Sequence, residues 1–202
     1  MEIKIDKINQ WLSSGSINIF GRPFAGKDTQ GELLAKLFGG VLIAGGDILR
    51  SHQDPAEIEK IMAAGGIIPS DFYLRMLLPY LLQPDLNGKP LLLSAVGRSH
   101  GEEDIILQAT ADSGHPMKAV VVLQLSEADV WQRFEESQLD HDRGNRTDDH
   151  REVLNNRLKK YQAKTVPVIE FYRNKGLLIE VDGTKSREEV TNEILNSLFN
   201  RI

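Results

Sequence analysis

The segment Gly21–Thr29 holds the residues best suited to chemistry. Its first seven residues, Gly-Arg-Pro-Phe-Ala-Gly-Lys, match the pattern G-x-x-x-x-G-K between a predicted strand and a predicted helix. Glycines let backbone N–H groups surround an anion, and the positive end of the following helix adds to the attraction. The Lys27 ammonium would reach the β- and γ-phosphates of a nucleotide. The pattern therefore predicts a phosphate-binding loop whose contacts come from Gly21, Pro23, Ala25, Gly26, Lys27, Asp28 and Thr29.

Asp28 departs from this pattern, because a Ser or Thr usually follows the lysine directly and here Thr29 comes one position later. A carboxylate beside a triphosphate is repelled unless a cation lies between them. Asp28 is therefore either a surface-pointing residue on the first helical turn, where negative charge is favourable, or a ligand in the shell of a magnesium ion. Asp28 and Thr29 are the candidate metal ligands.

Alternating strand and helix patterns must position this loop. Five short runs are mostly apolar on both faces, as in strands covered on each side: Ile17–Phe20, Val41–Ala44, Leu91–Val96, Ala119–Leu125 and Leu177–Val181. Between them, apolar residues recur at helical spacing in Thr29–Leu37, Asp71–Leu82, Glu102–Ala111, Glu127–Glu136 and His150–Asn174. This alternation predicts an α/β fold with a parallel sheet. Ligands bind beyond the carboxyl ends of such strands, where the phosphate loop lies.

Composition narrows the class of protein. The chain has 202 residues, 41% hydrophobic and 26% charged, which predicts one globular domain. A net charge of -5 argues against a broad electrostatic grip on nucleic acid or on an anionic membrane. Cysteine is absent, which removes disulfides and thiolate zinc sites. No apolar run approaches the roughly 20 residues of a membrane span, and no signal peptide is evident, so we expect a cytoplasmic protein and a monomer.

The first residues, Met1–Ser14, place apolar side chains at helical spacing. They predict an amphipathic helix at the head of the chain, within residues 1–15. Such a helix either packs on the core or binds a partner.

Several motifs resemble those of adenylate kinases and related nucleoside monophosphate kinases. Gly26-Lys27-Asp28-Thr29-Gln30, with Pro23, is similar to their G-x-P-G-S-G-K-G-T-Q loop. Further segments resemble, in the family's order, T-G-D-M-L-R, G-x-L-V-P, L-L-D-G-F-P-R and R-x-D-D: Gly46–Arg50, Gly65–Pro69, Leu92–Arg98 and Arg146–Asp149, the last followed by Arg157. The ending Val181-Asp182-Gly183-Thr184 is also similar to that family's last strand and turn.

The resemblance implies a three-layer P-loop fold with a five-stranded parallel sheet, forming a single kinase domain over residues 1–202. It implies a monophosphate-binding part at residues 45–73 and a short lid at 134–146. It also implies magnesium-dependent transfer of the ATP γ-phosphate to a nucleoside monophosphate, so the partners would be ATP, the monophosphate and Mg²⁺.

The same resemblance implies roles for several arginines, whose guanidinium groups can form paired hydrogen bonds with phosphate oxygens. Arg50 and Arg98 would hold the acceptor monophosphate, whereas Arg146 and Arg157 would close over the transferring group together with Lys27. Arg133 would stack on the donor base, near Thr184. The family's second lid arginine corresponds to Ser137 here, and Arg143 is a candidate substitute.

Ser94 stands where the family has an aspartate that holds water around magnesium. We therefore consider that the carboxylate has moved from this position to Asp28.

Glu102 stands where adenylate kinases have a glutamine, and Gly45 where they have a threonine. An ionised carboxylate only accepts hydrogen bonds, which suits guanine or a cytosine amino group better than adenine. Alternatively, Glu102 is only the exposed first residue of a helix, or the adjacent Glu103 contacts the acceptor base instead. The rest of the pattern favours AMP as the acceptor, bound by Gly45, Arg50, Ile67, Ile68, Arg98 and Glu102. Alternatives are a kinase for GMP, CMP or UMP, a kinase for a small metabolite alcohol, and a nucleotide-binding regulator without turnover.

Overall fold

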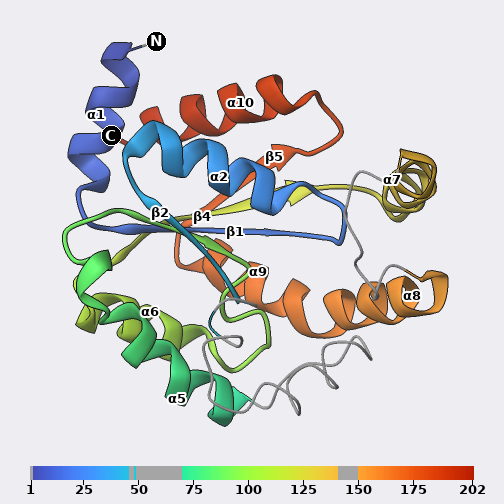
Figure 1. Ribbon diagram of the computed structural model, residues 1–202, viewed down its shortest axis with the longest axis horizontal. Coiled ribbons are helices and arrows are strands. Elements are labelled where there is room, and N and C mark those ends of the chain that lie inside the picture. The colour runs from blue at the N-terminus through green and yellow to red at the C-terminus, as the bar shows by residue number, and fades with distance from the viewer. Residues whose placement is uncertain (1, 46–47, 49–69, 141–149) are drawn as a thin grey trace.

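The computed structural model describes residues 2–45, 48, 70–140 and 150–202 (Figure 1). Its strands are β1 (Ser16–Gly21), β2 (Val41–Ala44), β3 (Leu91–Ser94), β4 (Met117–Gln124) and β5 (Leu178–Asp182). Its α-helices are α1 (Glu2–Leu12), α2 (Lys27–Phe38), α5 (Ser70–Leu81), α6 (Glu103–Asp112), α7 (Glu127–Asp140), α8 (Arg151–Lys160), α9 (Val166–Asn174) and α10 (Arg187–Phe199). Two short helical turns complete them, a 3₁₀ turn at Pro84–Leu86 and a π turn at Tyr161–Thr165.

Within the described residues, the five strands form one parallel sheet in the order β2-β3-β1-β4-β5. Figure 1 shows α1, α2 and α10 over one face and α5, α6 and α9 over the other. The expected three-layer α/β architecture is confirmed, and every strand boundary lies within two residues of the predicted one. Because every neighbour is parallel, the carboxyl ends of all five strands lie at one edge of the sheet.

The segment His150–Asn174 was predicted to be helical, and it is, although not as one regular α-helix. It consists of α8, the π turn and α9. Pro167, at the start of α9, has no N–H to donate to the preceding turn. The widened turn absorbs this gap, with the Val166 N–H donating to the Tyr161 carbonyl.

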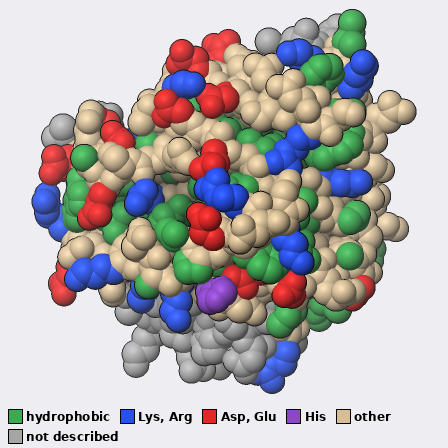
Figure 2. Space-filling model, turned by 180° about the vertical axis from the view of Figure 1, so that it is seen from behind, with side chains coloured by type: hydrophobic (Ala, Val, Ile, Leu, Met, Phe, Trp, Pro, Cys, Tyr) green, Lys and Arg blue, Asp and Glu red, His purple; other side chains and the backbone are tan. Residues whose placement is uncertain are grey.

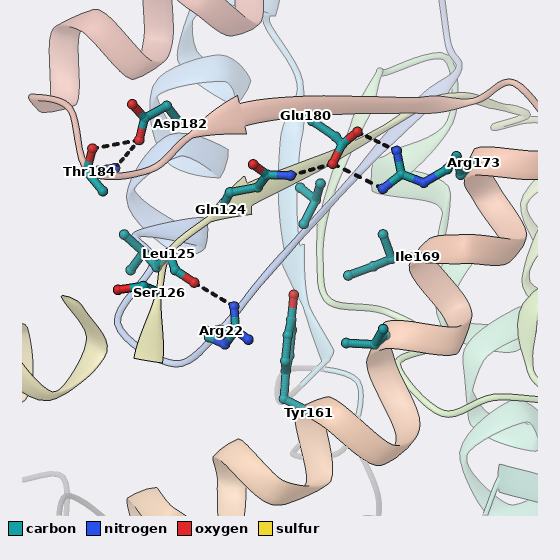
Figure 3. A pocket seen from close by; sticks show the side chains of 12 residues that line it. Arg22, Gln124, Leu125, Ser126, Tyr161, Ile169, Arg173, Glu180, Asp182 and Thr184 are labelled. Atoms are coloured by element: carbon teal, nitrogen blue, oxygen red, sulfur yellow. Dashed lines mark hydrogen bonds and ion pairs between the residues drawn. The ribbon is translucent and has the colours of Figure 1, made fainter. Parts of the chain in front are cut away.

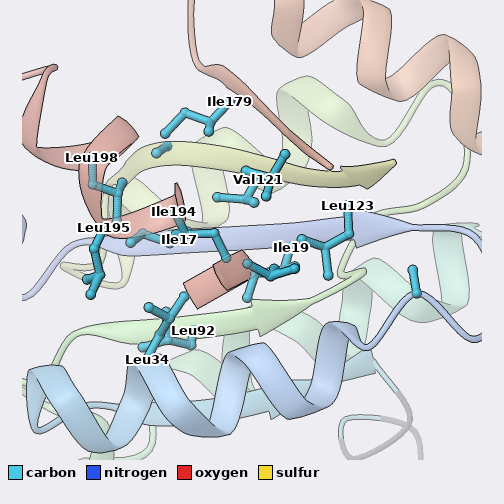
Figure 4. Packing of buried hydrophobic residues seen from close by; sticks show 14 of the residues in the cluster. Ile17, Ile19, Leu34, Leu92, Val121, Leu123, Ile179, Ile194, Leu195 and Leu198 are labelled. Carbon is cyan, nitrogen blue, oxygen red and sulfur yellow. The ribbon is translucent and has the colours of Figure 1, made fainter. Parts of the chain in front are cut away.

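Apolar side chains alternate between the two faces of the sheet and build two core clusters. On one face, Ile17 and Ile19 pack with Leu34 of α2 and Ile194 of α10 (Figure 4). On the other face, Phe20 belongs to a second cluster with residues of α5, α6 and α9. Burial on both faces explains why the strands read as continuous apolar runs.

Helix α1 packs against α10 and α2 through Ile8 and Leu12, which are fully buried. The Lys4 ammonium adds a hydrogen bond to the Asn196 side chain at 2.8 Å. Of the two alternatives for this segment, the packed helix is the one observed.

Charges on the surface are mixed. Figure 2 shows Lys and Arg interspersed with Asp and Glu on the face behind that of Figure 1. In the described ranges, no helix combines the length and apolar character needed to cross a membrane.

Candidate nucleotide site

The phosphate loop joins β1 to α2 at the carboxyl edge of the sheet. Gly26 precedes α2 in the left-handed region, with φ at 83°, and no side chain caps that end of the helix. Such an end carries partial positive charge and N–H donors that can bind an anion. The Lys27 ammonium folds over the loop and donates to the Arg22 carbonyl oxygen at 3.1 Å. The uncapped start of α2 and the Lys27 ammonium thus lie together at this loop, where they could bind an anion.

Phe24 occupies a strained position inside this loop. Its φ is 65°, a left-handed value that a side chain disfavours by about 1 kcal/mol or more. The ring is 8% exposed and packs edge-on against Phe134 of α7, with 5.7 Å between centroids. Aromatic packing therefore holds a backbone conformation in which glycine would be relaxed.

This balance gives a testable prediction. The Phe24→Gly variant is expected to be more stable than Phe24→Ala by about 1 kcal/mol, because both lose the ring packing but only alanine keeps the strain. Urea denaturation of the two variants measures the difference. Phe134 lies within a helix, so Gly and Ala substitutions there should show the reverse order by about 1 kcal/mol. The same order at both positions would contradict the prediction.

Arg133 links the phosphate loop to the turn after β5. Its guanidinium donates to the Phe24 carbonyl oxygen at 3.1 Å and to the Gly183 carbonyl oxygen at 2.6 Å. The neighbouring Thr184 donates its hydroxyl and its backbone N–H to the Asp182 carboxylate, and these hydrogen bonds hold the pKa of that carboxyl below its usual range. Two residues predicted to contact the donor, Arg133 and Thr184, thus lie at the same edge as the loop.

Ser94 and Asp28 are in direct contact. The Ser94 hydroxyl, at the end of β3, donates to the Asp28 Oδ1 atom at 2.5 Å. Ser94 is 5% exposed, whereas Asp28 is exposed on the first turn of α2. The side chain of Asp28 is therefore turned toward the sheet end.

Arg98 follows β3 on a tightly fixed loop. The buried Asn18 side chain of β1 bonds both backbone groups of Val96, donating to its oxygen at 2.7 Å and accepting from its nitrogen at 3.3 Å. The Thr165 hydroxyl donates to the Arg98 carbonyl oxygen at 2.9 Å. These bonds hold the backbone while the Arg98 side chain stays exposed.

Glu102 and Glu103 are both buried, at 3% and 4% exposure, which corrects the expectation of an exposed first helical residue. Glu102 accepts a hydrogen bond from the Ser99 N–H at 3.1 Å. Glu103 accepts from the Gly101 N–H at 2.6 Å and lies 2.8 Å from the His100 Nδ1 atom. Both carboxylates therefore help to shape the loop that follows Arg98.

A cavity of about 430 Å³ opens beside the loop at the ends of β4 and β5 (Figure 3). Arg22 borders it, donating to the Leu125 carbonyl oxygen at 2.5 Å with its guanidinium 5.4 Å from the centre of the Tyr161 ring. Burial raises the pKa of Tyr161. On the other side, hydrogen bonds from Arg173 lower the pKa of Glu180. Thr184, which was predicted to contact the donor, lines this cavity together with Asp182 of the same motif.

The site residues predicted from the sequence did not include two polar residues, Gln30 and Asn18, that connect elements around the site. Gln30 donates to the Arg187 carbonyl oxygen and accepts from the Thr191 hydroxyl, so it ties α2 to α10. Asn18 had a visible signal, since it is the polar residue inside the apolar run Ile17–Phe20. A buried amide must find partners, and here they are in the Arg98 loop.

The remaining predicted residues divide into two groups. Gly45 directly follows β2, and Arg157 lies half-buried on α8. Arg50, Ile67, Ile68, Arg143 and Arg146 lie outside the described residues, as do most of the segment 45–73 and residues 141–146 of the predicted lid 134–146. Where the chain is described, no three His, Asp or Glu side chains gather as metal ligands. A magnesium ion held mainly by phosphate oxygens and water needs no such cluster.

Comparisons with known proteins agree with this geometry. The family model for adenylate kinase matches residues 19–177. An adenylate kinase from Parvibaculum lavamentivorans is 35% identical over 182 residues, covering 87% of this chain and 88% of the relative. Adenylate kinases from Parasynechococcus marenigrum and Nitrobacter winogradskyi are 33% and 32% identical, covering 88% and 87% of this chain and 95% and 89% of each relative. With its phosphate loop, its Arg98 loop and this sequence match, the chain belongs to the adenylate kinase family of phosphotransferases.

Proposed function

We propose that the protein catalyses reversible, magnesium-dependent transfer of the ATP γ-phosphate to AMP. The observation that carries this proposal is the placement of two loops on neighbouring strands. The phosphate loop follows β1 and the Arg98 loop follows β3, and Ile19 pairs with Ser94 at that edge. Asn18 bonds the second loop to the strand that carries the first. A donor and an acceptor phosphate would therefore be held side by side, as in-line transfer requires.

Each side chain has a role in this proposal. Lys27 and the start of α2 bind the donor phosphates, and Arg133 with Thr184 borders the donor base. Arg98, with Arg50, holds the acceptor phosphate, while Arg146 and Arg157 neutralise charge on the transferring group. Mg²⁺ bound with ATP would offset the negative charge of the phosphate oxygens. Since both substrates are metabolites of the cell interior, we propose a cytoplasmic enzyme.

The acceptor base is read by the region around Glu102. AMP is the first choice because the matched motifs and the named relatives are those of adenylate kinases. The buried Glu102 carboxylate favours a second candidate, a base with N–H donors such as guanine or cytosine.

A coupled assay with ATP, Mg²⁺ and each of AMP, GMP, CMP and UMP tests the proposal, and AMP is expected to give the highest kcat/KM. The Glu102→Gln variant, which adds a donor for adenine N1, is expected to raise the AMP-to-GMP ratio about tenfold. Glu103→Gln is the matched control, since it neutralises the adjacent buried carboxylate and should leave that ratio unchanged. A higher kcat/KM for GMP or CMP than for AMP would show that AMP is not the preferred acceptor. Bound ATP without transfer to any monophosphate would indicate a regulator instead.

A further inference from the structure

The contact between Asp28 and Ser94 carries a further inference about how magnesium is held. These residues are 66 positions apart, yet the Ser94 hydroxyl lies 2.5 Å from Asp28 Oδ1. Asp28 lies on the first turn of α2, directly after the phosphate loop, and Ser94 ends β3, which pairs with the strand β1 that precedes the loop. The alternative of an Asp28 side chain pointing away from the site does not fit this contact.

Electrostatics decides what such a carboxylate can do there. Asp28 directly follows Lys27, so its charge lies close to the bound phosphates. Two anions in that position repel one another unless a cation lies between them. The positive end of α2 favours Asp28 in the empty protein, but the phosphates occupy the same end when nucleotide is bound. A cation that arrives with the nucleotide removes this conflict.

The different surroundings of the two side chains support a role for Asp28 in binding a metal ion. Ser94 is buried and has its hydroxyl committed to Oδ1, which fixes the orientation of the carboxylate. Asp28 itself is an exposed residue on the first turn of α2, so solvent and ions can reach it. Magnesium keeps several of its waters in nucleotide sites, and a carboxylate is a strong acceptor for them.

We propose that Asp28, oriented by Ser94, is the carboxylate that holds the hydrated magnesium ion of MgATP. This inference rests on the proposed function for the donor nucleotide and for the magnesium ion that accompanies it. Asp28 thus takes the place of an acidic residue at the end of β3, where this chain has serine. Ser94 is a positioning residue that acts through Asp28.

Equilibrium binding separates this proposal from catalysis. Isothermal titration calorimetry gives the Kd of ATP with Mg²⁺ and with EDTA, and the ratio of the two is the gain due to the metal. Asp28→Asn is expected to lower this gain about tenfold, while ATP alone binds as well as before or more tightly, because a repulsive charge is gone. Ser94→Ala is expected to lower the gain by a smaller factor of about three, since the carboxylate remains but is no longer oriented.

Two further variants make the test sharp. Glu32→Gln removes an exposed carboxylate one turn further along α2 and is expected to leave the gain unchanged. The double variant Asp28→Gly with Ser94→Asp moves the carboxylate to the end of β3 and is expected to restore most of the gain. An unchanged gain in Asp28→Asn, or an equal loss in Glu32→Gln, would overturn the proposal. Because no acceptor is present, these results do not depend on which monophosphate the enzyme uses.

Discussion

The Lys27→Ala variant is expected to lose about 10³-fold in kcat/KM while its melting temperature stays close to that of the parent protein. The Lys27 ammonium lies over the phosphate loop, 3.1 Å from the Arg22 carbonyl oxygen, where the donor phosphates would enter. Removal of one preorganised donor from a transition-state site typically costs 10²–10³-fold, and here a full charge is lost as well. The side chain is only half-buried, so the fold loses little packing.

A matched control is available on the same helix. Lys36 is exposed in the last turn of α2, and Lys36→Ala removes the same charge far from the loop. Its kcat/KM is expected to stay within about twofold of the parent value, as for most exposed surface substitutions. Lys27→Arg is expected to restore little activity, because a planar fork cannot replace a compact ammonium in a closed loop. A loss of less than tenfold in Lys27→Ala would contradict the assigned role.

The Gly97→Ala variant is expected to destabilise the fold by about 4 kcal/mol, through added strain and overpacking. Gly97 has a φ of 67°, and a Cβ atom there would lie 2.3 Å from the Cγ1 atom of Ile106. Ile106 is fully buried in α6 and cannot move aside easily. Because Arg98 is the next residue, any shift of the loop also moves the guanidinium that we propose to hold the acceptor phosphate. Urea denaturation gives the free energy of unfolding, and the KM for AMP is expected to rise with it.

The Gly101→Ala variant distinguishes backbone strain from steric overlap with Ile106. Its φ is 97°, but a Cβ atom there would meet nothing within 4 Å. Gly101→Ala therefore adds only backbone strain, expected at about 1 kcal/mol. In the Gly97→Ala background, Ile106→Ala should cost less than it does alone, since it removes the overlap. Equal losses for the two glycine variants would show that the steric overlap with Ile106 is not the cause.

The fold was predictable from the sequence because burial on both faces leaves a clear apolar signal. Runs such as Ile17–Phe20, in which all four side chains are buried, are typical of a strand covered on both faces. The break between α8 and α9 was harder to predict. Pro167, which causes it, lies within an apolar pattern of helical spacing that continues on both sides. The π turn lets the helical backbone continue through this position. Pattern alone cannot distinguish such a turn from a regular helix.

The candidate site was likewise predictable only in part. Local chemistry, such as the glycines and the lysine of the phosphate loop, can be predicted because the residues that act together are adjacent in sequence. The contact of Ser94 with Asp28 and the bond of Asn18 to Val96 depend on how strands lie side by side. The burial of Glu102 likewise depends on packing around the Arg98 loop rather than on its own position in a helix. Pairings of this kind become visible only in three dimensions.

The aromatic packing that begins at Phe24 also gives the protein an optical reporter. The Phe134 ring that holds Phe24 is packed edge-on against Trp131, with 5.8 Å between centroids. The Arg151 guanidinium, at the start of α8, lies 4.9 Å from the centre of the Trp131 ring. Indole emission is sensitive to a neighbouring charge, so movement of the phosphate loop or of α8 changes the surroundings of one fluorophore. Since Trp11 is the second tryptophan and lies on α1, replacing it with phenylalanine would leave Trp131 as a single, native probe of the site.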